Sequence, residues 1–154
     1  MANTAQQIFR DLDARIWKPF YLLLGEEPFQ ANEIAGRVKG FFVKGEDSSA
    51  FNYETWEGDG LDPAALLGSL EMMPGLFDEP GSVRFIVCRR FEKVSAGALD
   101  VLTRYFEDPF ESTVFLMLAS KVDKRKRWFK AASEKGYVIE LRAPYEREWP
   151  KWKI

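Results

Sequence analysis

The sequence contains no histidine and only one cysteine among its 154 residues. A chain without histidine lacks the usual general base near neutral pH, and none of its serine or cysteine side chains can be activated by a histidine partner. The single cysteine, Cys88, rules out an internal disulfide and suits a reducing compartment. Because it ends an apolar run, we expect Cys88 to pack rather than react. These absences exclude the histidine-dependent classes of enzyme.

Long apolar runs are absent as well. No stretch is apolar over the roughly 20 residues that a membrane-spanning helix needs. Residues 1–17 are polar and amphipathic, without the apolar centre of a signal peptide. A net charge of −2 and a pI near 5.4 argue against a protein that binds nucleic acid over its whole surface. We therefore predict a cytoplasmic protein that has no membrane partner.

The chain does have the material for a core. Apolar residues make up 46% of it and aromatic residues 15%, including 13 phenylalanines and five tryptophans. This composition is typical of a packed domain and not of a disordered chain. The length suits one domain, or one domain of a longer protein.

Apolar strands and amphipathic helices alternate along the sequence. Short continuous apolar runs predict buried strands, and apolar residues spaced three or four apart predict helices. The expected strands cover residues 20–24, 51–56, 83–88, 113–119 and 137–141, and the expected helices cover residues 8–16, 28–42, 63–73, 96–106 and 124–135. Such alternation is typical of a parallel sheet between two layers of helices. We predict an α/β fold with a five-stranded parallel sheet and helices on both faces.

Polar residues mark where three of the helices should begin. Asp62, Ser95 and Asp123 are good N-caps, because their side-chain oxygens can accept hydrogen bonds from the free N–H groups of a first turn. Met73 continues the apolar spacing of the helix that Asp62 begins, so we expect it on the buried face. Gly136 should end the last helix.

The turn after the first strand has the position of a phosphate site but not its residues. Phosphate-binding turns use glycines to bring backbone N–H groups close and a lysine to neutralise charge. Here Gly25 is followed by Glu26 and Glu27, and residues 30–32 are Gln, Ala and Asn where the motif has Gly, Lys and Ser or Thr. Each glutamate can stabilise the start of the next helix by about 0.3–1 kcal/mol. We expect a capped helix; a Mg²⁺ or Ca²⁺ site on the two glutamates is the alternative, but no further oxygen ligand is nearby in the sequence.

The end of the third expected strand lacks the second part of a nucleotide site. A nucleotide hydrolase keeps an acidic residue there for Mg²⁺. This chain has Cys88, Arg89 and Arg90. Arginine cannot ligate a cation, so hydrolysis is not expected. A nucleotide- or metal-dependent enzyme with a degenerate phosphate loop is kept as the alternative function.

Four segments, taken in order, resemble the N-terminal domain of the delta subunit of bacterial DNA polymerase III. They are YLLLGEEPFQANEI, FNYETWEGDGLDPAALLGSLEMMPGLF, VRFIVCRRFEKVSAGALDVLTRYFEDP and TVFLMLASKVDKRKRWFKA, and the match in order and spacing runs from about Phe20 to the end. The resemblance implies a clamp-loader domain of the AAA+ type, related to P-loop NTPases, that has lost ATP binding. It implies no catalytic residue, no cofactor and no small-molecule substrate.

The resemblance also implies a partner. Delta subunits bind the ring-shaped sliding clamp, the beta subunit of DNA polymerase III, and help open it for loading onto primed DNA, while ATP on neighbouring subunits supplies the energy. The clamp-binding apolar pair corresponds to Leu76 and Phe77, with Met72 and Met73 as support. The residues alone leave open that the pair folds back over the end of the sheet. The acidic residues within 78–80 depart from the family's pattern.

The resemblance divides the chain into three parts. Residues 1–19 form an N-terminal helical extension, residues 20–145 the AAA+-like domain, and residues 146–154 the start of a linker. Delta subunits continue into two further helical domains, a lid and a collar that holds the loader ring together. We therefore expect this chain to be a fragment, and its contacts with other clamp-loader subunits to lie in the missing part.

Lysine and arginine gather in one run, residues 121–130, which includes Lys124, Arg125, Lys126 and Arg127. The simplest interpretation is a solvated helix face whose tryptophan turns to the core. The alternative is a weak nucleic-acid-binding patch that contacts phosphates of DNA threaded through the clamp. The sequence leaves both open.

Overall fold

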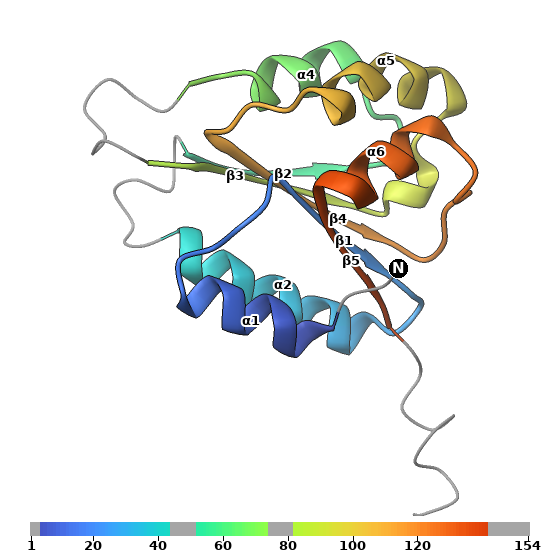
Figure 1. Cartoon of the computed structure of the whole chain (residues 1–154). Coiled ribbons are helices and arrows are strands. Elements are labelled where there is room, and N and C mark those ends of the chain that lie inside the picture. The colour runs from blue at the N-terminus through green and yellow to red at the C-terminus, as the bar shows by residue number, and fades with distance from the viewer. Residues whose placement is uncertain (1–3, 44–51, 74–81, 142–154) are drawn as a thin grey trace, which may run out of the picture.

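The computed structural model describes residues 4–43, 52–73 and 82–141 (Figure 1). Its helices are α1 (Ala5–Asp13), α2 (Pro28–Phe42), α4 (Pro63–Leu70), α5 (Ala96–Glu107) and α6 (Arg127–Lys135), with a short 3₁₀ turn, η1, at Phe91–Lys93. Its strands are β1 (Phe20–Leu24), β2 (Tyr53–Glu57), β3 (Arg84–Arg89), β4 (Thr113–Ala119) and β5 (Gly136–Glu140). Strands and helices alternate as the sequence predicts.

The five strands form one sheet in the order β2-β3-β4-β1-β5, and every neighbouring pair is parallel. The predicted five-stranded parallel sheet is confirmed. β4 is the central strand, and β1 lies between β4 and β5, with Leu22 opposite Met117 of β4 and Val138 of β5. Because the strands are parallel, their carboxyl ends meet along one edge of the sheet and their amino ends along the other.

Helices cover both faces of the sheet, with α1 and α2 on one side and α4, α5 and α6 on the other (Figure 1). Successive side chains of β1 point to opposite layers: Leu22 belongs to the core under α4, α5 and α6, and Leu23 to the core under α1 and α2. Every residue of β1 and β4 is buried, as continuous apolar strands between two helical layers should be. Aromatic rings fill the core under α4, α5 and α6. The ring centroid of Phe106 lies 4.9 Å from that of Phe20 and 5.3 Å from that of Trp128.

The N-terminal helix α1 packs on the sheet through apolar and polar contacts. Thr4 caps the helix by accepting a 3.1 Å hydrogen bond from the N–H of Gln7. Ile8 and Leu12 are buried in the same core as α2. The hydroxyl of Tyr137 on β5 donates a 2.6 Å hydrogen bond to the carboxylate of Asp11. This bond holds α1 to β5, the outermost strand on that side of the sheet.

Two of the three predicted N-caps are confirmed. Asp62 accepts a hydrogen bond from the N–H of Ala64, and Ser95 accepts one from the N–H of Ala98, both at 3.1 Å. The third prediction, Asp123, is wrong. Its carboxylate accepts from the N–H of Arg125 at 3.0 Å within a separate turn, and α6 begins only at Arg127, with no side-chain cap. The turn around Asp123 satisfies that carboxylate before the helix starts.

The prediction that Met73 lies on a buried helix face is also wrong. α4 ends at Leu70, and 62% of the surface of Met73 is exposed. The sequence contains the reason, since Pro74 follows Met73 and the residue before a proline is disfavoured in the helical conformation. The buried residues of α4 are Leu66, Ser69 and Leu70.

Candidate functional site

The carboxyl ends of β1, β3 and β4 surround a hollow of about 460 Å³. Its walls include Gly25 and Glu26 after β1, Arg89 and Arg90 at the end of β3, and Ser120 after β4. Ligands of open α/β sheets bind in crevices at this edge. The polar groups that line the hollow therefore determine what it could hold.

Gly25 makes the turn after β1 because of close packing within the protein. Its φ is +144°, and a Cβ atom at this position would lie 2.5 Å from the carbonyl oxygen of Leu141. The N–H of Gly25 donates to the carbonyl of Ala119 at 3.0 Å, and the N–H of Leu141 donates to the carbonyl of Leu24 at 2.6 Å. The backbone donor of this glycine is thus used inside the sheet, whereas a phosphate loop would direct such donors at its ligand.

The second glutamate after Gly25, Glu27, caps helix α2 as predicted. Glu27 is the N-cap, its carboxylate accepts a 2.9 Å hydrogen bond from the N–H of Phe29, and Pro28 is the first helical residue. A carboxylate in this position stabilises the positive end of the helix. It also fills the place that an anionic ligand would need.

The other polar groups of the hollow bind one another. Arg90 forms a 2.7 Å ion pair with Glu57, and Arg89 donates a 3.1 Å hydrogen bond to Asn32. Glu92 accepts a 3.0 Å hydrogen bond from the backbone N–H that follows β4. Among the residues that the structure describes, no three Cys, Asp or Glu side chains gather in a group that could hold a metal ion. The residues that line the hollow include no lysine for the phosphates of ATP, and its described carboxylates belong to no group that could hold the Mg²⁺ used in hydrolysis.

Two methionines are exposed after the end of α4, close to the amino ends of the strands. Met72 and Met73 expose 40% and 62% of their surface. The sulfur of Met73 lies 3.8 Å from the hydroxyl of Ser112, the residue before β4. Leu76 and Phe77, the other positions that the resemblance assigns to clamp binding, lie outside the described residues.

Three of the four cations that the sequence suggests for a phosphate contact have carboxylate partners. The pairs are Lys124 with Glu140 at 2.9 Å, Arg125 with Asp123 at 3.0 Å, and Arg127 with Glu107 at 2.8 Å. Hydrogen bonds from Arg125 lower the pKa of Asp123 to about 2, so that carboxylate keeps its charge at neutral pH. These pairs favour a solvated surface, formed by the turn before α6 and the start of that helix. Contact of residues 124–127 with DNA stays a prediction.

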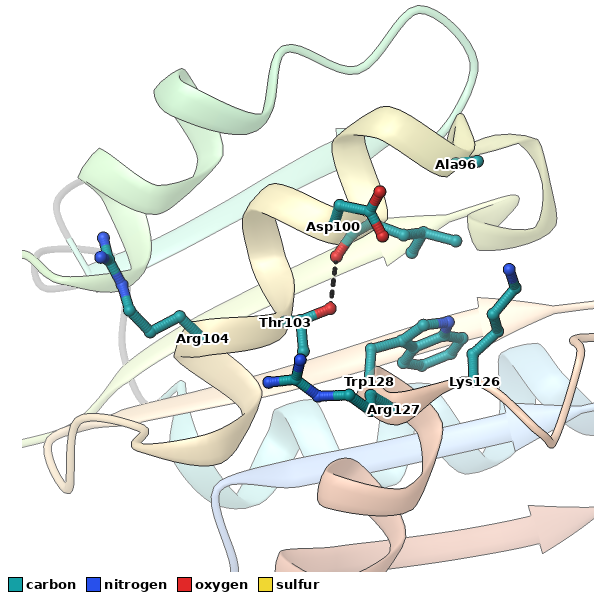
Figure 2. Close-up of a pocket in the computed structure, with 8 residues that line it drawn as sticks. Ala96, Asp100, Thr103, Arg104, Lys126, Arg127 and Trp128 are labelled. Atoms are coloured by element: carbon teal, nitrogen blue, oxygen red, sulfur yellow. Dashed lines mark hydrogen bonds between the residues drawn. The ribbon is translucent and has the colours of Figure 1, made fainter.

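A hollow of about 270 Å³ lies between α5 and the first turn of α6 (Figure 2). Asp100 and Arg104 of α5 line one side, and Lys126 and Arg127 line the other. Trp128 also lines the hollow, although only 2% of its surface is exposed. The sequence did not predict this hollow, because α6 begins later than expected and the turn before it shapes the opening.

Comparison with known proteins identifies the family. The family model described as DNA polymerase III, delta subunit, matches residues 21–142. The chain belongs to this family. The resemblance that four segments of the sequence suggest is therefore confirmed. Among curated proteins, no sequence matches this delta-family chain.

Solved structures share the fold of the delta-family chain. The DNA clamp loader delta protein of Bacillus subtilis superposes with a TM-score of 0.79 at 19% identity, over 98% of this chain and 46% of that protein. A gamma subunit-related protein of DNA polymerase III from Thermotoga maritima gives 0.63 at 12% identity, over 94% and 47%. RuvB of Thermotoga maritima gives 0.51 at 14% identity, over 89% and 42%. The AAA+-like fold is confirmed, and the chain spans about half the length of each of these proteins.

The cysteine of this delta-family chain should be unreactive while the protein is folded. Cys88 is fully buried, and burial, followed by the nearby charges of Glu57 and Glu92, raises the pKa of its thiol to about 12. Since the thiolate is the reactive form, we expect almost no labelling by a thiol reagent at pH 8 and complete labelling in denaturant. Rapid stoichiometric labelling of the native chain would contradict this placement.

Sequence reasoning missed one polar cluster in the delta-family domain. Arg84 is the first residue of β3, its surface is 0% exposed, and it pairs with Glu54 of β2 at 3.0 Å. The available signal was an arginine at the beginning of an otherwise apolar strand, because a buried charge needs a partner. The sequence does not identify that partner, which lies thirty residues away.

Proposed function

We propose that this domain binds the sliding clamp and helps open it for loading onto primed DNA, as a subunit domain of the clamp loader that has no catalytic activity of its own. Membership of the delta subunit family supports the clamp-loading role. The observation that carries the clamp contact is the exposure of Met72 and Met73, at 40% and 62%, beside the positions that the resemblance assigns to the clamp.

Exposed methionines suit this role physically. Their side chains are unbranched and polarizable, so they adapt to an apolar pocket on a partner. Leu76 and Phe77 are the main anchors in this proposal, since a few large apolar residues usually supply most of the free energy of an interface. The domain shifts the clamp toward the open ring only as far as it binds that ring more tightly than the closed one.

Partners other than the clamp belong to the same proposal. The solved relatives are about twice as long as the described fold, and contacts with other clamp-loader subunits would use such additional parts. A cytoplasmic location follows from the proposed role. The test of the proposal is direct capture of the purified clamp by this chain. Neither alternative function, a nucleotide- or metal-dependent enzyme or a nucleic-acid-binding module, predicts such capture.

We expect this chain not to bind ATP. Glu27 caps the helix where phosphate would lie, and Arg90 at the end of β3 is paired with Glu57, so the hollow lacks a site for either phosphate or Mg²⁺. Calorimetric titration with ATP and Mg²⁺ should give only the heat of dilution. Saturable heat at a stoichiometry near one would instead support the alternative of a degenerate nucleotide-dependent enzyme.

A further inference from the structure

A buried charged cluster lies beneath the end of α4. The Arg84 side chain is 0% exposed, and its Nη2 atom donates hydrogen bonds to Glu54 Oε2 and to Ser69 Oγ, both at 3.0 Å. The hydroxyl of Ser69 donates to Glu54 Oε1 at 2.6 Å, and the indole N–H of Trp56 donates to the same oxygen at 3.0 Å. The cluster thus joins β2, α4 and β3.

The carboxylate in this cluster is charged at neutral pH. Burial raises the pKa of Glu54, but the hydrogen bonds from Ser69, Arg84 and Trp56 lower it more, and the net direction is downward from 4.5. The side chain of Glu54 is 33% exposed, so the pair is buried at the arginine and reaches solvent at the carboxylate.

Strand β4 also holds the last turn of α4 in place. Ser69 lies one residue before the end of the helix, and the hydroxyl of Thr113 on β4 donates a 2.8 Å hydrogen bond to the carbonyl of Leu70. The backbone N–H of Arg84 donates to the carbonyl of Ser112 at 2.9 Å, and the hydroxyl of Ser112 lies 3.8 Å from the sulfur of Met73. Ser112 and Thr113 therefore contact Arg84 of the cluster, the last turn of α4 and the exposed Met73.

An ion pair of this kind is weak evidence for a contribution to stability. Replacing a buried pair by apolar side chains of similar volume is often neutral or stabilising, whereas removing one partner is costly. The contribution of the cluster is to orientation. Its directional hydrogen bonds fix the end of α4 relative to β2 and β3. A surface whose geometry is fixed before binding loses less conformational entropy when it binds.

We propose that Arg84, Glu54 and Ser69 are positioning residues that hold the surface formed by Met72 and Met73 in the geometry that binds the clamp. The proposal rests on the function proposed above. It makes clamp affinity depend on buried polar contacts that never touch the clamp.

Three variants separate positioning from stability. Ser69→Ala removes the hydroxyl that joins α4 to both charged partners. The triple variant Arg84→Met, Glu54→Leu, Ser69→Ala replaces the cluster by apolar side chains and should unfold near the temperature of the parent. Tyr137→Phe is the matched control, because it removes the 2.6 Å hydrogen bond to Asp11 on the other face of the sheet.

Clamp affinity is measured by surface plasmon resonance at a temperature where circular dichroism shows every variant folded. We expect Ser69→Ala and the triple variant to bind at least tenfold more weakly than the parent, and Tyr137→Phe to bind like the parent. If the triple variant regains both stability and parental affinity, the cluster only supports the fold and the inference is wrong. If the parent itself does not bind, the proposed function fails instead.

Discussion

The double substitution Leu76→Ala, Phe77→Ala should reduce clamp affinity by roughly a thousandfold. Truncating an interface anchor typically costs about 2 kcal/mol or more, and 1.4 kcal/mol corresponds to a factor of ten in the dissociation constant. Two such anchors therefore account for about half of the roughly 8 kcal/mol that a micromolar interface provides. Replacing Met72 and Met73 by alanine should have a smaller effect, about tenfold, because we assign them a supporting role. Titration of the purified clamp measures both effects.

The control for this prediction is Phe29→Ala. Phe29 is an exposed aromatic residue, with 74% of its surface accessible. It lies at the start of α2, near the carboxyl ends of the strands, whereas Met72 and Met73 lie near their amino ends. Its removal should leave clamp affinity unchanged. A double variant at positions 76 and 77 that binds as tightly as the parent would remove the assignment of that pair, whatever the methionine variant does.

Gly58→Ala should destabilise the fold by about 3 kcal/mol, near the upper end for overpacking a tightly packed position. Gly58 follows β2, and its N–H donates a 2.8 Å hydrogen bond to the carbonyl of Arg89. A Cβ atom here would overlap the carbonyl group of Arg90, with only 2.8 Å to the carbonyl carbon, and would lie 3.2 Å from the Cα of Phe91. Backbone atoms cannot rotate away, so the ends of β2 and β3 would have to separate. Urea denaturation measures the free energy of unfolding.

Gly68→Ala is the matched control. Gly68 lies within α4, and apart from its chain neighbours and the backbone of its own helix, no described atom lies within 4 Å of the position that its Cβ would take. Alanine is the better helix former by about 1 kcal/mol, so this substitution should stabilise the chain slightly. Equal and small effects at both glycines would show that the close approach of Gly58 to Arg90 is not a constraint on the fold.

The sequence predicts the sheet well because burial between two helical layers leaves a direct mark on it. β1 and β4 are continuous apolar runs, and both are buried at every residue. Helix ends are less well predicted where a polar side chain has two possible partners. Asp62 and Ser95 cap helices, but Asp123 binds the N–H of Arg125 in a turn instead. The local sequence is suitable for either outcome.

The candidate sites differ in how far the sequence determines them. The missing phosphate site is local, since Gly25 and Glu27 are close in the chain, and the capped helix was predicted correctly. The cluster of Glu54, Ser69 and Arg84 joins residues that are fifteen and thirty positions apart. Glu54 and Ser69 have ordinary explanations on a protein surface, and Arg84 in an apolar strand indicates a buried charge without identifying its partner. Only the fold brings them together beneath the end of α4.

A domain without a nucleotide site can act on a ring only through contacts with it. The free energy for opening must then come from the difference in affinity for the two states of the clamp. For this reason, binding should need neither ATP nor Mg²⁺.

The most direct measurement is a titration of the purified cognate clamp with this chain in the presence of a chelator and without nucleotide. We expect saturable binding whose affinity does not change when ATP and Mg²⁺ are added. Absence of binding under both conditions, or binding that appears only with ATP, would contradict the proposal that this domain acts through its contacts with the clamp and without nucleotide.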